Sequence, residues 1–113
     1  MSRLPELQLQ RLETYCAEHV PPHVRDQIKI EMTTRGTAIT VWECRPPWSE
    51  DADRDWTRTK IAQLRYDPDH FTWTMFWADR NGRWLAYPGL PPTANFDRVM
   101  DELDRDPHAC FWG

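Results

Sequence analysis

Cysteine and histidine side chains give this sequence its first candidates for chemistry. Cys16, His19 and His23 are three and then four residues apart, so a helix turn and its exit could direct a thiolate and two imidazoles at one metal ion. His108 and Cys110 could complete such a site. The pattern is weak, because structural zinc sites usually carry paired C-x-x-C knuckles and two prolines interrupt the segment between the first two histidines. We therefore predict neither a bound metal nor another cofactor.

A cysteine nucleophile is the second kind of chemistry that these residues could support. Cys44 or Cys110 would supply the thiolate and His108 the general base, brought together by the fold. The sequence has four glycines, none of them in a phosphate-binding or oxyanion-binding loop, and no serine in a nucleophile-elbow motif. A small thiol- or metal-dependent enzyme around Cys44, His108 and Cys110 is therefore our alternative prediction, and we lean towards a protein without enzymatic activity.

The segment from Pro46 to Trp56, PPWSEDADRDW, is rich in proline and acid and has no helical or strand periodicity. Its carboxylates come from Glu50, Asp51, Asp53 and Asp55. The run has neither the turn glycine nor the bidentate glutamate of a calcium-binding EF-hand, so we interpret it as a solvated acidic loop. Trp48 and Trp56 flank the run, where they would either clamp the loop onto the fold or present aromatic anchors to a partner.

The residues from His70 to Tyr87, HFTWTMFWADRNGRWLAY, predict the hairpin around which the fold is organised. Asn81-Gly82 suits a two-residue type I′ turn, which would place Arg80 opposite Arg83. In that register the core face of the hairpin carries Phe71, Trp73, Met75, Trp77, Trp84 and Ala86. The opposite face carries Thr72, Thr74, Phe76, Ala78, Leu85 and Tyr87.

Periodicity and turn residues predict the other elements. Helices are expected over residues 4–20 and 95–105, and strands over 24–34, 37–45, 57–66, 70–79 and 83–87. The aromatic tail at 108–113 is expected to dock through Phe111 and Trp112. The fold class is thus α+β: residues 1–113 form a single domain, in which an N-terminal and a C-terminal helix pack on one face of a five-stranded antiparallel β-meander.

The registers of the other two hairpins follow from their turn residues. A two-residue turn at Arg35-Gly36 would set Met32 opposite Ile39, which brings the apolar residues of the two strands onto one face. A turn at 67–70 would set Tyr66 opposite Phe71.

Composition and charge restrict the class of protein. The formal net charge of −4 argues against a protein that binds nucleic acid mainly by neutralising phosphates, although it is compatible with a local basic patch. The sequence has no apolar run long enough to span a bilayer and no signal-peptide core, so we expect a cytoplasmic protein outside the membrane. Three cysteines, an odd number, favour free thiols over a disulfide framework.

The second face of the predicted sheet, the face away from the core, has the composition of a binding surface. It mixes aromatic and polar residues: Lys29, Glu31, Trp42, Cys44, Gln63, Arg65, Thr72, Thr74, Phe76, Leu85 and Tyr87. Its aromatics could stack nucleic acid bases or bury against a protein, including a second copy of this chain, and the acidic balance favours protein.

Our leading prediction is a small interaction module that binds protein through this second face or through the acidic loop. The candidate binding residues are Trp42, Arg65, Phe76, Tyr87, Trp48 and Trp56. The opposing interpretation, that the acidic loop or the C-terminal tail simply covers the second face, stays open.

Three segments give the chain a family resemblance: WECRPPW (Trp42–Trp48), WADRNGRW (Trp77–Trp84) and ELDRDPHACFWG (Glu102–Gly113). In them the sequence resembles the small bacterial, mainly actinobacterial, proteins grouped as domain of unknown function 3024. The resemblance extends from the second predicted strand to Gly113. It implies no activity, cofactor or catalytic residue, so the candidates above depend on their own chemistry.

Overall fold

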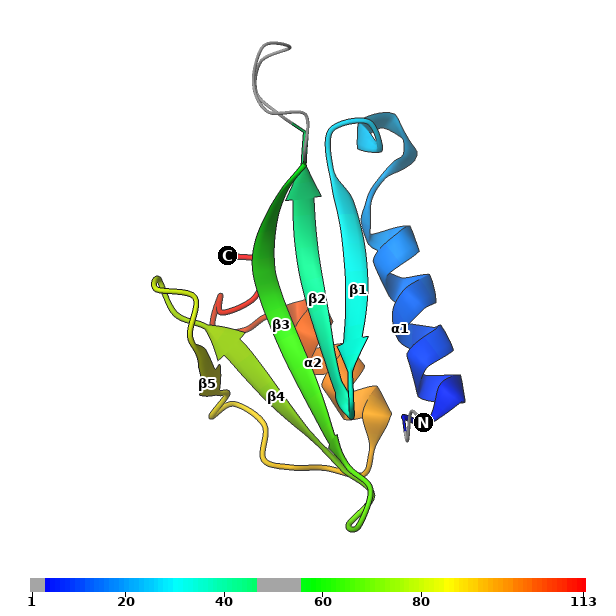
Figure 1. Ribbon diagram of the computed structural model, residues 1–113, viewed down its shortest axis with the longest axis vertical. Coiled ribbons are helices and arrows are strands. Elements are labelled where there is room, and N and C mark those ends of the chain that lie inside the picture. The colour runs from blue at the N-terminus through cyan, green and yellow to red at the C-terminus, as the bar shows by residue number, and fades with distance from the viewer. Residues whose placement is uncertain (1–3, 47–55) are drawn as a thin grey trace.

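The computed structural model describes residues 4–46 and 56–113, which form two helices and a five-stranded antiparallel sheet (Figure 1). Helix α1 spans Glu6–His19, a short 3-10 turn η1 spans Pro22–Val24, and helix α2 spans Phe96–Arg105. The strands are β1 Lys29–Arg35, β2 Ala38–Arg45, β3 Thr57–Asp67, β4 Thr72–Ala78 and β5 Trp84–Ala86. Each strand pairs with the next along the chain, in the order β1-β2-β3-β4-β5. The predicted fold class, an α+β meander with terminal helices, is confirmed.

Local signals explain where the two helices begin and end. α1 follows Pro5, whose fixed φ suits a helix start, and it ends just before the two prolines that follow Val20. The side chain of Asn95 accepts a hydrogen bond from the backbone N–H of Asp97 at 3.0 Å and so caps the start of α2. Neither described helix has the length and hydropathy of a transmembrane span.

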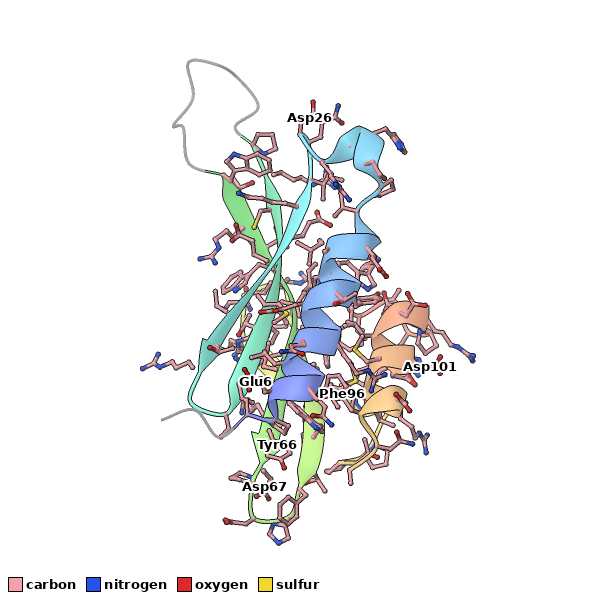
Figure 2. The ribbon with its side chains drawn as sticks, turned by 90° about the vertical axis from the view of Figure 1, so that its right-hand side faces the viewer. Glu6, Asp26, Tyr66, Asp67, Phe96 and Asp101 are labelled. Atoms are coloured by element: carbon pink, nitrogen blue, oxygen red, sulfur yellow. The ribbon has the colours of Figure 1, made fainter. Side chains whose placement is uncertain are left out.

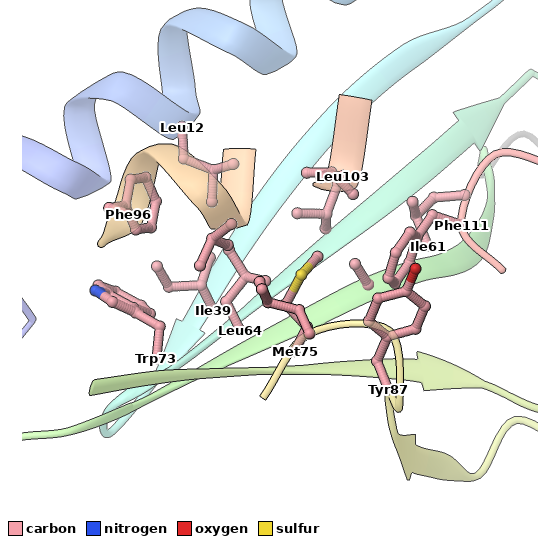
Figure 3. Close-up of a cluster of buried hydrophobic side chains, with 14 of the residues drawn as sticks. Leu12, Ile39, Ile61, Leu64, Trp73, Met75, Tyr87, Phe96, Leu103 and Phe111 are labelled. Carbon is pink, nitrogen blue, oxygen red and sulfur yellow. The ribbon is translucent and has the colours of Figure 1, made fainter. Parts of the chain in front are cut away.

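Both helices lie on the same face of the sheet, and the core fills the space between them and the strands (Figure 2). Figure 3 shows Leu12 of α1 and Leu103 of α2 directed towards Ile39, Leu64 and Met75 of the sheet, all five of them fully buried. We call this the helix-covered face. The second face is the one turned away from both helices, and Figure 1 views the sheet from that side, with α2 behind it.

The predicted registers of the β1–β2 and β3–β4 hairpins are each wrong by two residues. Met32 lies opposite Val41 rather than Ile39, because the turn is Gly36-Thr37, with Gly36 at a φ of 60° that favours glycine. Tyr66 lies opposite Trp73 rather than Phe71. A shift of two keeps every side chain on its predicted face, because the side-chain period of a strand is two.

Phe71 is a further correction. We predict it in the core, but it lies in the β3–β4 turn with a φ of 55° and is 67% exposed. Since β4 begins one residue later, at Thr72, Phe71 contributes nothing to the strand face.

The β4–β5 hairpin differs from its predicted register by one residue, which changes the face of every residue in β5. Trp84 lies opposite Ala78, and the turn has three residues, 80–82, in place of two. The cause is Asp79, whose carboxylate accepts hydrogen bonds from the backbone N–H groups of Asn81 (2.8 Å) and Arg83 (2.9 Å). This arrangement favours a type I turn closed by a residue at positive φ, and Gly82 has a φ of 78°.

This one-residue shift puts four residues on the face opposite to the one predicted. Trp84 and Ala86 lie on the second face, beside Ala78 and Phe76, rather than in the core. Leu85 and Tyr87 lie on the helix-covered side. Tyr87 is only 3% exposed, and its backbone N–H donates to the carbonyl of Met75 at 2.9 Å.

A β-bulge in β3 changes the face of the residues before it. Val41 pairs with Ala62 but Trp42 pairs with Lys60, so Ile61 is an extra residue and both it and Ala62 are buried. Simple alternation from Ala62 would turn Lys60 towards the core. The bulge instead sends Lys60, and Arg58 two residues earlier, to the second face with Trp42.

Candidate binding surface on the second face

Four cations lie over four aromatic rings on the second face. The guanidinium carbon Cζ of Arg65 is 3.8 Å from the ring centroid of Phe76, and that of Arg58 is 4.7 Å from Trp42. The ammonium nitrogens complete the set, with Lys29 4.5 Å from Trp56 and Lys60 5.4 Å from Trp84. Such contacts are attractive because the ring face carries negative partial charge.

Hydrogen bonds hold several of these side chains in place. The indole Nε1 of Trp42 donates to Thr33 Oγ1 at 2.8 Å. Arg65 Nε donates to Gln63 Oε1 at 2.7 Å, and Gln63 Nε2 in turn donates to Thr40 Oγ1 at 3.1 Å. The surface is thus preorganised, which lowers the conformational entropy that binding would cost.

The second face is locally basic although the chain as a whole is acidic. Glu31 forms ion pairs with both Lys29 and Arg58 at 3.4 Å. Within the described residues, Lys60 and Arg65 form no ion pair with a carboxylate. These two cations are the ones best placed to meet anions of a partner.

A shallow depression of about 490 Å³ lies where β2 and β3 face the β4–β5 turn. The depression is lined by Trp42, Arg58, Thr59, Lys60, Ala78, Asp79, Arg80 and Gly82. Lys60 Nζ donates to the carbonyl of Gly82 at 2.6 Å, which ties the turn to the sheet at this point. The depression therefore combines a flat aromatic side chain with three cations and one carboxylate, that of Asp79, which pairs with Arg83 at 3.0 Å.

Comparison with known proteins places the chain in a family. The family model described as Domain of unknown function (DUF3024) matches residues 1–113. The chain belongs to the DUF3024 family. Comparison with curated proteins gives no match, and comparison with solved structures gives none either. The resemblance noted in the sequence is confirmed, and the function of this DUF3024 protein has to be argued from its own residues.

The structure brings together four of the six predicted binding residues. Trp42, Arg65 and Phe76 share the second face, and Trp56 joins them through its contact with Lys29. The predicted placement of Tyr87 on this face is wrong, because its hydroxyl donates to Glu102 at 3.0 Å among buried residues.

Trp48 and the acidic run fall in 47–55, outside the described residues.

Sequence reasoning missed Arg58, Lys60 and Trp84 as members of the surface. Asp79 was the available signal for Trp84, because Asp is favoured at the first position of a type I turn. The bulge that redirects Arg58 and Lys60 has no comparable local signal in the sequence.

The C-terminal tail of the DUF3024 chain packs away from the second face. The ring of Phe111 is 4.9 Å from that of Tyr87, and Trp112 stacks on His19 at 4.1 Å. The indole Nε1 of Trp112 also donates to the carbonyl of Leu103 at 3.0 Å. The interpretation in which the tail covers the second face is therefore wrong.

The metal candidates do not form a ligand cluster. Within the described residues, no group of three Cys, His, Asp or Glu side chains is arranged to hold a metal ion. Cys16 is 4% exposed, and burial with the nearby Glu13 raises the pKa of its thiol to about 12. His19 stacks on Trp112, and His23 lies exposed in η1.

The structure separates Cys44 from His108, while Cys110 stays near His108 and its Sγ donates to the His108 backbone carbonyl at 3.7 Å. Cys44 is buried on the second face, whereas His108 contacts Tyr87 on the helix-covered side. Burial, and then the charge of Glu31, raise the pKa of the Cys44 thiol. Burial, and then Asp106, raise the pKa of Cys110. A raised pKa is opposite to the change that activates a cysteine nucleophile.

Proposed function

We propose that this DUF3024 protein is an interaction module that binds an anionic partner through its second face. One observation supports the proposal above all: four cations stacked on four aromatic rings occupy the face that neither helix covers. Tryptophan and arginine are the residues most enriched among binding hot spots, since they combine large contact area with directional donors.

The charges of the surface favour an anionic partner over a second copy of the chain. A two-fold dimer through this face would bring together two patches that each carry an excess of cations, because a symmetric interface pairs each patch with itself. Lys60 and Arg65 would then face a patch whose carboxylate, Glu31, already pairs with Lys29 and Arg58. An acidic partner would instead supply the carboxylates or phosphates that these two side chains lack.

The proposal includes a cytoplasmic location. Cys16, Cys44 and Cys110 are free thiols in the structure, as suits a reducing compartment.

Indole N–H signals in two-dimensional NMR give a direct test. Polyglutamate and a single-stranded oligonucleotide would be titrated separately into the full chain at low salt. We expect the Trp42 and Trp84 indole signals to move with at least one probe, while those of Trp73 and Trp112 stay in place. Each signal would be assigned with a Trp→Phe variant.

Charge-reversal variants provide the control. Arg65→Glu should abolish the shifts, and Arg98→Glu, the same charge change at an exposed position of α2, should preserve them. If neither probe moves Trp42 or Trp84, or if the two variants behave alike, the proposal is wrong.

A further inference from the structure

The guanidinium groups of the second face offer flat surfaces as well as charge. The Cζ of Arg65 lies over the Phe76 ring, 3.8 Å from its centroid, and the Nε–H of Arg65 donates to Gln63, which helps to hold the guanidinium there. The Cζ of Arg58 lies over the Trp42 ring at 4.7 Å from its centroid, and the Arg58 side chain is 44% exposed. Unpaired nucleic acid bases stack both on aromatic rings and on arginine planes.

The cations and rings follow the strands in an ordered pattern. Arg58, Lys60 and Arg65 all come from β3, the central strand of the sheet. The rings beneath them come from the flanking strands, Trp42 from β2 and Phe76 from β4, with Trp84 from β5. At about 3.3 Å per residue, the three cations extend over roughly 20 Å of β3. A row of positive charge bordered by stacking surfaces suits a chain of phosphates that carries planar bases.

The depression beside Trp42 also suits a nucleotide chain. Its lining includes Arg58, Lys60 and Arg80 around one aromatic side chain, so a base could lie against Trp42 or its arginine while cations meet the adjoining phosphates. The one carboxylate in the lining, that of Asp79, is already bound by Arg83 and by two backbone N–H groups of the turn. Carboxylates of an acidic polypeptide would use the charge but leave the stacking surfaces without a matching group. A duplex would hide its base faces from this sheet.

We propose that the second face binds single-stranded nucleic acid, an inference that rests on the proposed function. The acidic net charge of the chain does not oppose it, since it sums over both faces and the cations concerned are gathered on one. Three or four phosphate contacts predict a slope of log affinity against log salt of about −2 to −3.

Fluorescence anisotropy with labelled oligo(dU) and oligo(U) of about twelve nucleotides, which differ only in the 2′-hydroxyl, tests the inference on the full chain. A duplex of the same length and unlabelled polyglutamate serve as competitors. We expect both single strands to bind and neither competitor to displace them efficiently. A preference for oligo(U) would identify RNA through its 2′-hydroxyls, and equal binding would identify stacking without sugar recognition.

Three substitutions separate stacking from charge. Arg65→Lys keeps the charge but removes the plane, and should weaken binding about five- to tenfold with an unchanged salt slope. Arg65→Ala should weaken it further and reduce the magnitude of the slope by about 0.7. Arg98→Ala on α2 is the matched control and should bind as the unmodified chain does, with circular dichroism checking that each variant is folded.

The outcomes distinguish this inference from the proposed function. Tight polyglutamate binding that depends on Arg65, together with an Arg65→Lys variant that binds like the unmodified chain, would overturn nucleic acid recognition and leave an acidic protein as the partner. Absence of binding by either probe, or oligonucleotide binding that Arg65→Ala leaves unchanged, would overturn both.

Discussion

Replacing Asp106 should release the C-terminal tail and lower the free energy of unfolding. Asp106 caps α2 in the left-handed conformation, with a φ of 43°. Its carboxylate accepts hydrogen bonds from four backbone N–H groups: Cys110 at 2.8 Å, Phe111 at 3.1 Å, Trp112 at 2.8 Å and Gly113 at 3.2 Å. The tail is held in this way while Phe111, 5% exposed, packs on Tyr87.

The expected magnitude follows from the strength and exposure of these bonds. A hydrogen bond to a charged group contributes about 1.5–3 kcal/mol net. The four do not add, because N–H groups freed at a half-exposed site bond to water instead. Asp106→Ala should therefore cost about 2–4 kcal/mol, of which about 1 kcal/mol comes from alanine at positive φ. Asp106→Gly loses the carboxylate without that strain and should cost about 1–3 kcal/mol.

Asp106→Asn provides a closer comparison. Asparagine tolerates the left-handed conformation and keeps one acceptor oxygen, so we expect a loss of about 1–2 kcal/mol. Urea denaturation would measure all three variants. Hydrogen exchange of the Trp112 indole N–H, which bonds to Leu103, would report release of the tail.

Two results would refute the reasoning. If all three variants unfold within about 0.5 kcal/mol of the unmodified chain and the Trp112 indole stays protected, the carboxylate does not hold the tail. If Asp106→Ala alone is destabilised, backbone strain is the cause and the four hydrogen bonds contribute little.

Three more predictions concern the core, a thiol and a turn. Trp73→Ala should lower the free energy of unfolding, measured by urea denaturation, by about 3–5 kcal/mol because Trp73 is 2% exposed in the core. Trp84→Ala on the second face should lower it by about 1 kcal/mol, and similar losses for the two variants would contradict the observed register. Because the pKa of Cys16 is raised to about 12 in the folded protein, only the unfolded thiol ionises near pH 9, and the free energy of unfolding should fall above that pH by at most about 1.4 kcal/mol per pH unit. Urea denaturation between pH 8 and about 11 would measure this fall, which Cys16→Ala should flatten. The pKa of Asp79 is lowered, first by the backbone N–H of Arg83, so its contribution to stability is present above about pH 4 and is lost as the pH falls. Thermal unfolding of Asp79→Asn should therefore show a smaller loss of stability at acidic pH than the unmodified chain. An identical acid profile for the two would count against this role of the turn carboxylate.

The sequence by itself determined the class of fold and the order of its elements. Alternating apolar residues, the double proline after α1 and the Asn95 cap are local signals, and each acts within a few residues of its position. The same locality explains why Trp42, Arg65 and Phe76 could be assigned to one surface in advance. The two hairpin registers predicted wrongly by two residues still placed each strand side chain on the correct face, because the side-chain period of a strand is two.

Only the tertiary structure decided which charges and rings meet on that surface. Trp84 came to the second face because Asp79 selects a three-residue turn, and Arg58 and Lys60 came there because β3 bulges at Ile61 opposite Val41 and Trp42. Both depend on backbone pairing between strands, where a single inserted residue reverses the face of every residue beyond it in the strand. Net charge is a sum over the whole sequence. It therefore does not show how strand pairing distributes cations and carboxylates between the two faces of the protein.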